Sequence, residues 1–158
     1  YTAEELEFAR EIASSYSDDA KINSLRKSKR PDWRELVDVD LDGTIPDAWN
    51  EGEVGAGSTD VSDVSWHAPT MEFNTSAFAI GTPGHSWQNV AFSGMSIGHK
   101  SLIFAAKVIA ASALDLLTQP EALKAAQSEL KERLGGRKYV TPVPQDAKPP
   151  LDQWTEKT

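Results

Sequence analysis

The sequence contains no cysteine among its 158 residues. A disulfide scaffold, a thiolate nucleophile and a zinc–thiolate site are therefore excluded. Basic residues are outnumbered, because 16 Lys and Arg stand against 24 Asp and Glu, giving a formal net charge of −8. Binding to a phosphate backbone needs a basic stripe, so we expect no nucleic-acid partner. The lack of cysteine is compatible with the cytoplasm, where we expect the protein to reside.

Several catalytic and membrane signals are also missing. There is no Gly-x-Ser-x-Gly elbow, no phosphate loop and no His-Glu-x-x-His helix. The N-terminus has neither the basic region nor the apolar run of a signal peptide. The longest apolar run, Ser101 to Leu117, contains Lys107 and Asp115, and we interpret it as too short and too charged to span a membrane. The chain begins at Tyr1 without an initiator methionine, and we interpret it as part of a longer protein.

Helical spacing of apolar residues is the main structural signal. A capping box formed by Thr2 and Glu5 predicts a first helix over residues 3–16. Further helices are predicted over 60–65, 96–118 and 120–134. The helix predicted over 96–118 is apolar on almost every side, so we expect it to be buried, packed against a sheet. Residues 17–34 are polar and are interpreted as a connection.

Strands are predicted in two places. Val37, Val39 and Leu41 alternate with aspartates, which is the period of a half-buried strand, and residues 71–80 contain two further apolar stretches. Alternating helices and strands indicate the α/β class. We divide the chain into an N-terminal helix and connection (1–34), a main α/β part (35–136) and a proline-rich extended tail (137–158).

His85 is the first candidate functional residue. It follows a Gly-Thr-Pro-Gly turn between a predicted strand and a helix, where sites of open α/β sheets gather. A neutral imidazole suits zinc, cobalt or nickel. A histidine in a loop is, by itself, more often an ordinary surface or turn residue.

Other candidates have equally simple structural explanations. Asp60 and Asp63 lie at a predicted helix start, where acidic residues are favoured. They could also orient a metal-ligand histidine by accepting a hydrogen bond from its ring. His99 is explained either as a buried, hydrogen-bonded histidine or as a site residue. Trp66 and Trp87 are packing residues or part of the wall of a substrate pocket.

Asp38, Asp40 and Asp42, followed by Gly43, imitate the front half of a calcium loop. The second half of the segment does not match a calcium loop. Its ninth position is Pro46, and its twelfth position, which requires a bidentate glutamate, is Trp49. A calcium-binding or interaction module using the Asp38–Asp42 segment therefore stays as the alternative function.

Three motifs make the sequence specific. They are Gly57 to Trp66 (GSTDVSDVSW), Ala79 to Trp87 (AIGTPGHSW) and Ser96 to Lys100 (SIGHK), supported by Gly135-Gly136-Arg137 and Tyr139-Val140. Over residues 50–145 the chain closely resembles the aminobenzoyl-glutamate utilisation branch of the dinuclear-zinc metallopeptidases and amidohydrolases. This superfamily also includes glutamate carboxypeptidases, aminoacylases and auxin-conjugate amidohydrolases.

The resemblance implies a C-terminal segment of a phosphorylase/hydrolase-like zinc-peptidase catalytic domain, with a sheet flanked by helices and no lid domain. It implies that His85 is a metal ligand and that the turn at Thr59 and Asp60 shapes the site around it. Asp63 and His99 are further site-shaping candidates from their positions, and for Asp63 the structural explanation is favoured. The remaining ligands and the general base would lie upstream, so the chain alone is expected to be inactive. Two divalent metals are implied, zinc first, with manganese, cobalt and nickel as alternatives.

The whole enzyme would hydrolyse the amide bond of a small N-acyl amino acid, with an aminobenzoyl group as one candidate acyl group. The resemblance also implies a homodimer formed through the lid domain, and no membrane partner. Besides the calcium module, a second alternative is a purely structural domain, which keeps the family's sequence but has no segment elsewhere that completes a catalytic site.

Overall fold

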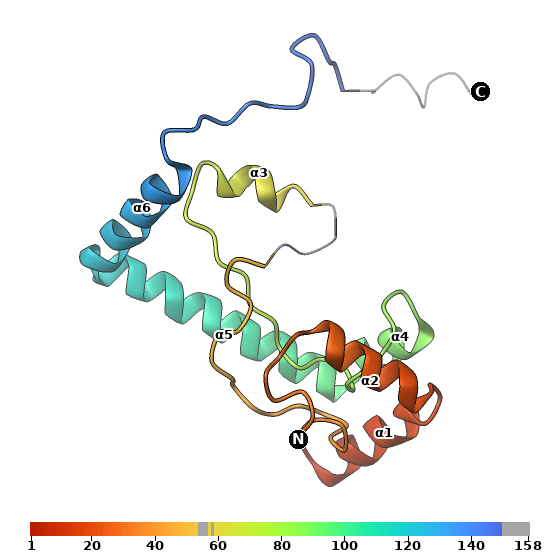
Figure 1. Ribbon diagram of the computed structural model, residues 1–158. Helices are drawn as coiled ribbons and strands as arrows, with labels where there is room; N and C mark the ends of the chain where they lie inside the picture. Colours follow the sequence, from red (N-terminus) through yellow and green to blue (C-terminus); the bar gives the residue numbers. More distant parts are fainter. Residues whose placement is uncertain (54–56, 58, 150–158) are drawn as a thin grey trace, which may run out of the picture. The chain divides into compact units, whose positions relative to one another are not determined.

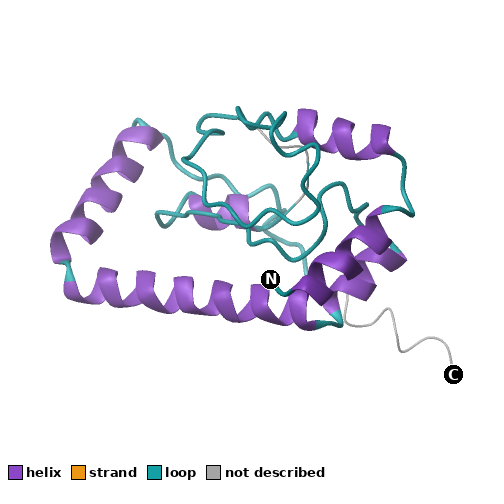
Figure 2. Cartoon of the chain, turned by 90° about the horizontal axis from the view of Figure 1, so that it is seen from below, coloured by secondary structure: helices purple, strands orange, loops and turns teal. Residues whose placement is uncertain are grey.

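The computed structural model describes residues 1–53, 57 and 59–149, and the regular structure in these ranges is helical (Figures 1 and 2). The helices are α1 (Ala3–Ala13), α2 (Asp18–Lys27), α3 (Val61–Ser65), α4 (Trp87–Ser93), α5 (Ser96–Thr118) and α6 (Pro120–Leu134). No strand occurs within the described ranges. The predicted α/β class, with a sheet flanked by helices, is therefore wrong.

The alternating aspartates and apolar residues have a different physical origin. Leu41 is buried in a hydrophobic core, whereas Asp40 and Asp42 form ion pairs with basic side chains. One backbone hydrogen bond links the two segments predicted as strands, from Ile80 N to Asp40 O (2.8 Å), and no ladder continues from it. Of the three alternating apolar residues only Leu41 belongs to the core, so the two-residue period does not mark a strand here.

The chain forms two compact units. The first comprises residues 1–57 and 72–120, and the second comprises residues 58–71 and 121–158. The first unit contains α1, α2, α4 and α5, and the second contains α3 and most of α6. The predicted division at residues 34 and 136 stays a prediction, and the part of the tail from 137 to 149 has no helix or strand.

A small apolar core holds the first unit together. It contains Ala9 of α1, Phe92 of α4 and Ile97 of α5, together with Leu41 and Ala79 from the connecting segments. The rings of Phe8 and Phe92 meet edge to face, with centroids 5.6 Å apart. Burial of such side chains is the main favourable term in folding, so these residues fix α1 against the α4–α5 corner.

Local capping signals explain where the helices begin. Thr2 and Glu5 form the predicted capping box of α1, which ends at Ala13 rather than at residue 16. In α2, which the sequence analysis missed, the Ser17 side chain accepts a hydrogen bond from Ala20 N. Its acidic first turn and basic last turn complement the helix dipole, and this charge order was the available signal.

The helix α5 has the predicted bounds but not the predicted surroundings. Only Ile97 and Ser101 are buried among its 23 residues. Ile109 and Leu117 are 59% and 83% exposed. The expectation of a mostly buried helix is therefore wrong for the described residues. By length and composition alone α5 could cross a membrane, with a mean hydropathy of 1.7 over 18 residues, so the interpretation of this run as too short and too charged is wrong.

Candidate functional site

The Gly-Thr-Pro-Gly-His-Ser turn places His85 directly before α4. Gly81 has φ 87°, and a Cβ there would lie 2.8 Å from the Cα of Lys21, so this turn requires glycine. The Ser86 side chain donates to Pro83 O (2.7 Å) and accepts from Asn89 N (3.3 Å). Ser86 thereby fixes the turn and caps α4, whose first residue is Trp87.

His85 itself has an unusual backbone conformation. Its φ is 54°, a region that non-glycine residues occupy at a cost, and its side chain is exposed. Lys29 shares this φ value. Strained residues of this kind gather at functional sites, which supports a function for His85 without defining its chemistry. The neighbouring Trp87 is 60% exposed, so its indole is not a core residue of the first unit.

The Thr59-Asp60 turn begins the short helix α3 in the second unit. The Thr59 side chain accepts from Val61 N (3.3 Å), and Asp60 O accepts from Asp63 N (3.1 Å). Asp60 occupies the N-cap position, but its carboxylate makes no capping bond. The expected helix is thus confirmed, whereas the capping explanation for Asp60 is not.

The remaining candidates are distributed between the two units. His99 lies in the first turn of α5 and is exposed, so the explanation as a buried histidine is wrong. Trp66 belongs to the second unit, where its ring lies 6.3 Å from that of Tyr139. His85 and His99 belong to the first unit, whereas Thr59, Asp60 and Asp63 belong to the second.

A dinuclear metal centre does not fit the part of the chain that the structure describes. No group of three or more His, Asp or Glu side chains there could hold a metal ion. His85 is a single donor in an exposed turn. If His85 binds a metal, the other ligands must come from residues outside this described part.

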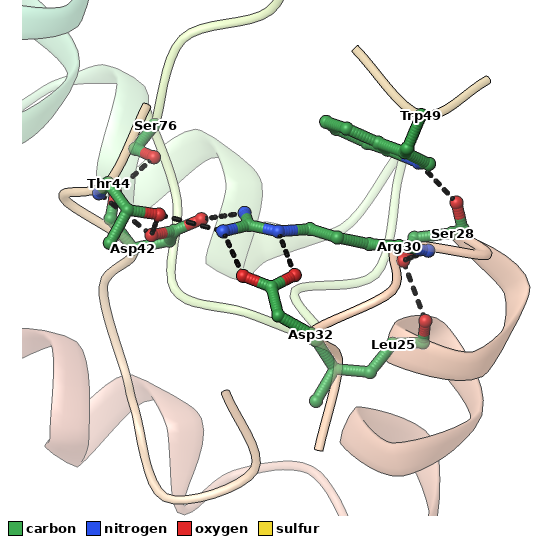
Figure 3. Close-up of polar contacts among 8 residues, drawn as sticks. All are labelled: Leu25, Ser28, Arg30, Asp32, Asp42, Thr44, Trp49 and Ser76. Carbon is green, nitrogen blue, oxygen red and sulfur yellow. Dashed lines mark hydrogen bonds and ion pairs between the residues drawn. The ribbon is translucent and has the colours of Figure 1, made fainter. Parts of the chain in front are cut away.

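Two aspartates of the calcium-like segment, Asp40 and Asp42, form ion pairs instead, and Figure 3 shows the contacts of Asp42. The Arg30 guanidinium, almost fully buried, lies between two carboxylates: Nε contacts Asp32 at 2.6 Å, and Nη1 pairs with Asp42. Its Nη2 donates to Thr44 Oγ1 (2.7 Å). Asp40 pairs with Lys21 (3.5 Å) and Arg10 (3.7 Å). Carboxylates held by cations in this way are not arranged for calcium.

The network changes the protonation of its members. Hydrogen bonding to Arg30 lowers the pKa of Asp32. Burial alone would raise the pKa of Asp42, but hydrogen bonds from Thr44 and Arg30 outweigh it, and the pKa is lowered. Arg30 was not singled out from the sequence, because a basic cluster between aspartates is typical of a solvated surface.

Comparison with known proteins relates the chain to a hydrolase that is built from subunits. The relative is one of the subunits of p-aminobenzoyl-glutamate hydrolase from Escherichia coli (strain K12), and it is 32% identical over 157 residues, covering 94% of this chain. The chain spans about a third (32%) of that relative. No protein-family model matches the chain, and no solved structure matches it. The predicted resemblance to the aminobenzoyl-glutamate branch is therefore confirmed.

Proposed function

We propose that this chain forms part of a hydrolase that cleaves the amide bond between an aminobenzoyl group and glutamate. The observation that carries this proposal is the identity of 32%, which extends over 94% of the chain rather than over an isolated motif. The chain corresponds to about a third of the relative, so we propose that it contributes one portion of the active site and is inactive alone.

His85 is the residue we propose for that portion. The left-handed backbone and the bonds of Ser86 hold the turn in a defined conformation before α4. An imidazole presented in this way can donate a lone pair to a divalent metal, zinc being the first candidate. The described residues contain one such donor in this turn and no metal-binding group, so His85 would complete a ligand set supplied by other residues.

The exposed face of α5 supports a protein partner for this chain. Its large apolar side chains that face solvent are Leu102, Ile103, Phe104, Ile109, Leu114, Leu116 and Leu117. Large apolar side chains exposed together on one helix indicate a surface that a partner covers. The relative's name describes one part of a larger hydrolase, and the chain spans only a portion of that relative, so we propose that protein from the same enzyme covers α5. The charged Lys107 and Asp115 within the helix favour a protein surface over lipid.

The homodimer, the cytoplasmic location and the divalent metal belong to this proposal as further predictions. They follow from the resemblance to the aminobenzoyl-glutamate branch. A hydrodynamic measurement on the complete enzyme tests the homodimer, and metal analysis tests the divalent metal.

The proposal is tested with His85→Ala in the complete protein that contains this chain. We expect hydrolysis of p-aminobenzoyl-glutamate to fall at least about a hundredfold, because loss of a metal ligand removes most of the catalytic effect of the metal. His99→Ala replaces another exposed imidazole of the same unit and should cost about tenfold or less. Unchanged activity and metal content in His85→Ala would contradict the assignment.

A further inference from the structure

A second site lies within the second unit, between α6 and the segment that follows α3. A cavity of about 500 Å³ opens there, lined on one side by Leu123, Leu130 and Leu134 of α6. Its other side includes His67, and Lys131 and Arg137 stand beside the leucines. This volume is within the range of small-molecule pockets, about 300–1,000 Å³.

One face of α6 produces the apolar floor of this pocket. Leu123, Leu130 and Leu134 are seven and four residues apart, which places them along a single side of the helix. Pro69, from the segment after α3, also lines the cavity. A ligand with an apolar body would therefore lose its hydration against carbon on both sides of the pocket.

The pocket has the opposite sign of charge from the rest of the chain. The chain carries a net charge of −8, yet Lys131 and Arg137 line the cavity, and no Asp or Glu among the described residues does. The nearby acid Glu129 pairs with Arg133 at 2.7 Å. Lys131 and Arg137 are exposed, so the pocket is open to solvent, and its two cations attract an anionic group.

Arg137 is held in place before any ligand arrives. Its Nε donates to Leu134 O (3.0 Å) and its Nη2 donates to Arg133 O (2.8 Å), which satisfies carbonyls at the end of α6. Its guanidinium lies 5.7 Å from the Trp66 ring centroid. His67 is likewise positioned, edge-on to Tyr139 with ring centroids 4.9 Å apart. Fixed groups of this kind reduce the entropic cost of binding.

We propose that this pocket binds a small carboxylate with an apolar body, its anionic end held by Lys131 and Arg137 and its body against the leucines of α6. The contacts of Arg137 within the described residues leave Nη1 without a bond, so that nitrogen is available to the carboxylate. This inference concerns binding only and does not require hydrolysis or a metal.

Equilibrium dialysis of the 158-residue chain with 2-naphthoate tests the proposal, with 2-naphthamide as the uncharged ligand of the same shape. We expect 2-naphthoate to bind and Lys131→Gln to raise its Kd about two- to fivefold, the effect of one partly exposed ion pair. For the unaltered chain, the Kd of naphthamide should exceed that of naphthoate by at least the factor expected for Lys131→Gln. Lys131 is exposed, so its replacement leaves the fold intact.

Lys124→Gln is the matched control, because Lys124 lies on α6 but does not line the pocket. Its replacement should leave the Kd of naphthoate unchanged. Equal binding of naphthoate and naphthamide would overturn the proposal, since it indicates apolar adsorption, for example on α5. Absence of naphthoate binding, or an equal loss in both lysine variants, would overturn it as well. None of these binding results bears on activity toward p-aminobenzoyl-glutamate, which tests the proposed function separately.

Discussion

Lys100 Nζ lies 2.8 Å from the Glu5 carboxylate, so one ion pair joins the first turn of α1 to the first turns of α5. Glu5 also accepts from Thr2 N (2.7 Å) and from the Ser96 hydroxyl. The hydrogen bond from Lys100 and those from Ser96 and Thr2 lower the pKa of Glu5 from its ordinary value of 4.5 to about 2. The carboxylate is therefore a shared anchor for two helices, and its partner Lys100 lies 95 residues away in sequence.

The stability of the chain should depend on pH through Glu5. Because the pKa of Glu5 is lower in the folded state, its contribution is complete above pH 4.5 and is lost as the pH falls toward about 2. Glu5→Gln removes this dependence and lowers the urea midpoint at pH 7. Urea unfolding at pH 7, 4 and 2.5, followed by circular dichroism, measures both effects.

Glu4→Gln is the control for this experiment, since Glu4 is the exposed neighbour of Glu5 in the same helix turn. Its unfolding curve at each pH should stay close to that of the unaltered chain. A Glu5→Gln variant with the same loss of stability in acid as the unaltered chain would show that other carboxylates control acid unfolding.

Replacing the buried guanidinium should be more costly than replacing a surface cation. Arg30→Gln leaves Asp32 and Asp42 without their cation, and breaking a buried ion pair in this way costs about 3–5 kcal/mol. Lys27→Gln, at the exposed end of α2, should cost under about 1 kcal/mol. Denaturant unfolding at neutral pH gives both values, and similar costs for the two variants would refute the structural importance of the network.

Gly98 is required by the close approach of α5 to the end of α4. A Cβ at this position would lie 2.5 Å from Phe92 O and 2.9 Å from the Cα of Ser93. Both are backbone atoms and cannot rotate away, so Gly98→Ala should destabilise the chain by about 1–3 kcal/mol, despite alanine's better helix propensity. Thermal unfolding measures this change.

Gly94→Ala provides the comparison, because a Cβ there meets Val90 O at an ordinary 3.6 Å. This variant should change the free energy of unfolding by less than about 0.5 kcal/mol. The interpretation of the α4–α5 corner would fail if Gly98→Ala were as harmless as Gly94→Ala.

Side chains of the first unit should divide sharply between core and surface. Phe92 is fully buried, and Phe92→Ala should cost about 3–5 kcal/mol. Leu117 is 83% exposed, so Leu117→Ala should cost under about 0.5 kcal/mol in the isolated chain. In the complete enzyme the Leu117 variant should become more harmful, because we propose that protein covers α5 there.

Features set by neighbouring residues were predictable from the sequence. The capping box of Thr2 and Glu5 depends on residues three apart, and both helices predicted over 96–118 and 120–134 have the expected bounds. Gly135 and Gly136 end α6 with positive φ values of 56° and 79°, as their position indicates. Interactions of this kind need no information about distant parts of the chain.

Features that depend on distant partners were not predictable in the same way. The period of Val37, Val39 and Leu41 is equally compatible with a strand and with an irregular segment in which only Leu41 reaches the core. The composition of α5 indicates that something should cover it but not what. His85 and Asp60 were candidates from their positions in turns, the resemblance added Thr59 and gave all three their roles, and these roles stay predictions.

The uncovered side of α5 also bears on how a cell would have to make this protein. A newly synthesised chain that displays Leu102, Phe104 and Leu117 to water offers binding sites to chaperones and to other unfinished chains. We therefore expect the chain to accumulate to a higher level when the protein that we propose to cover α5 is produced at the same time.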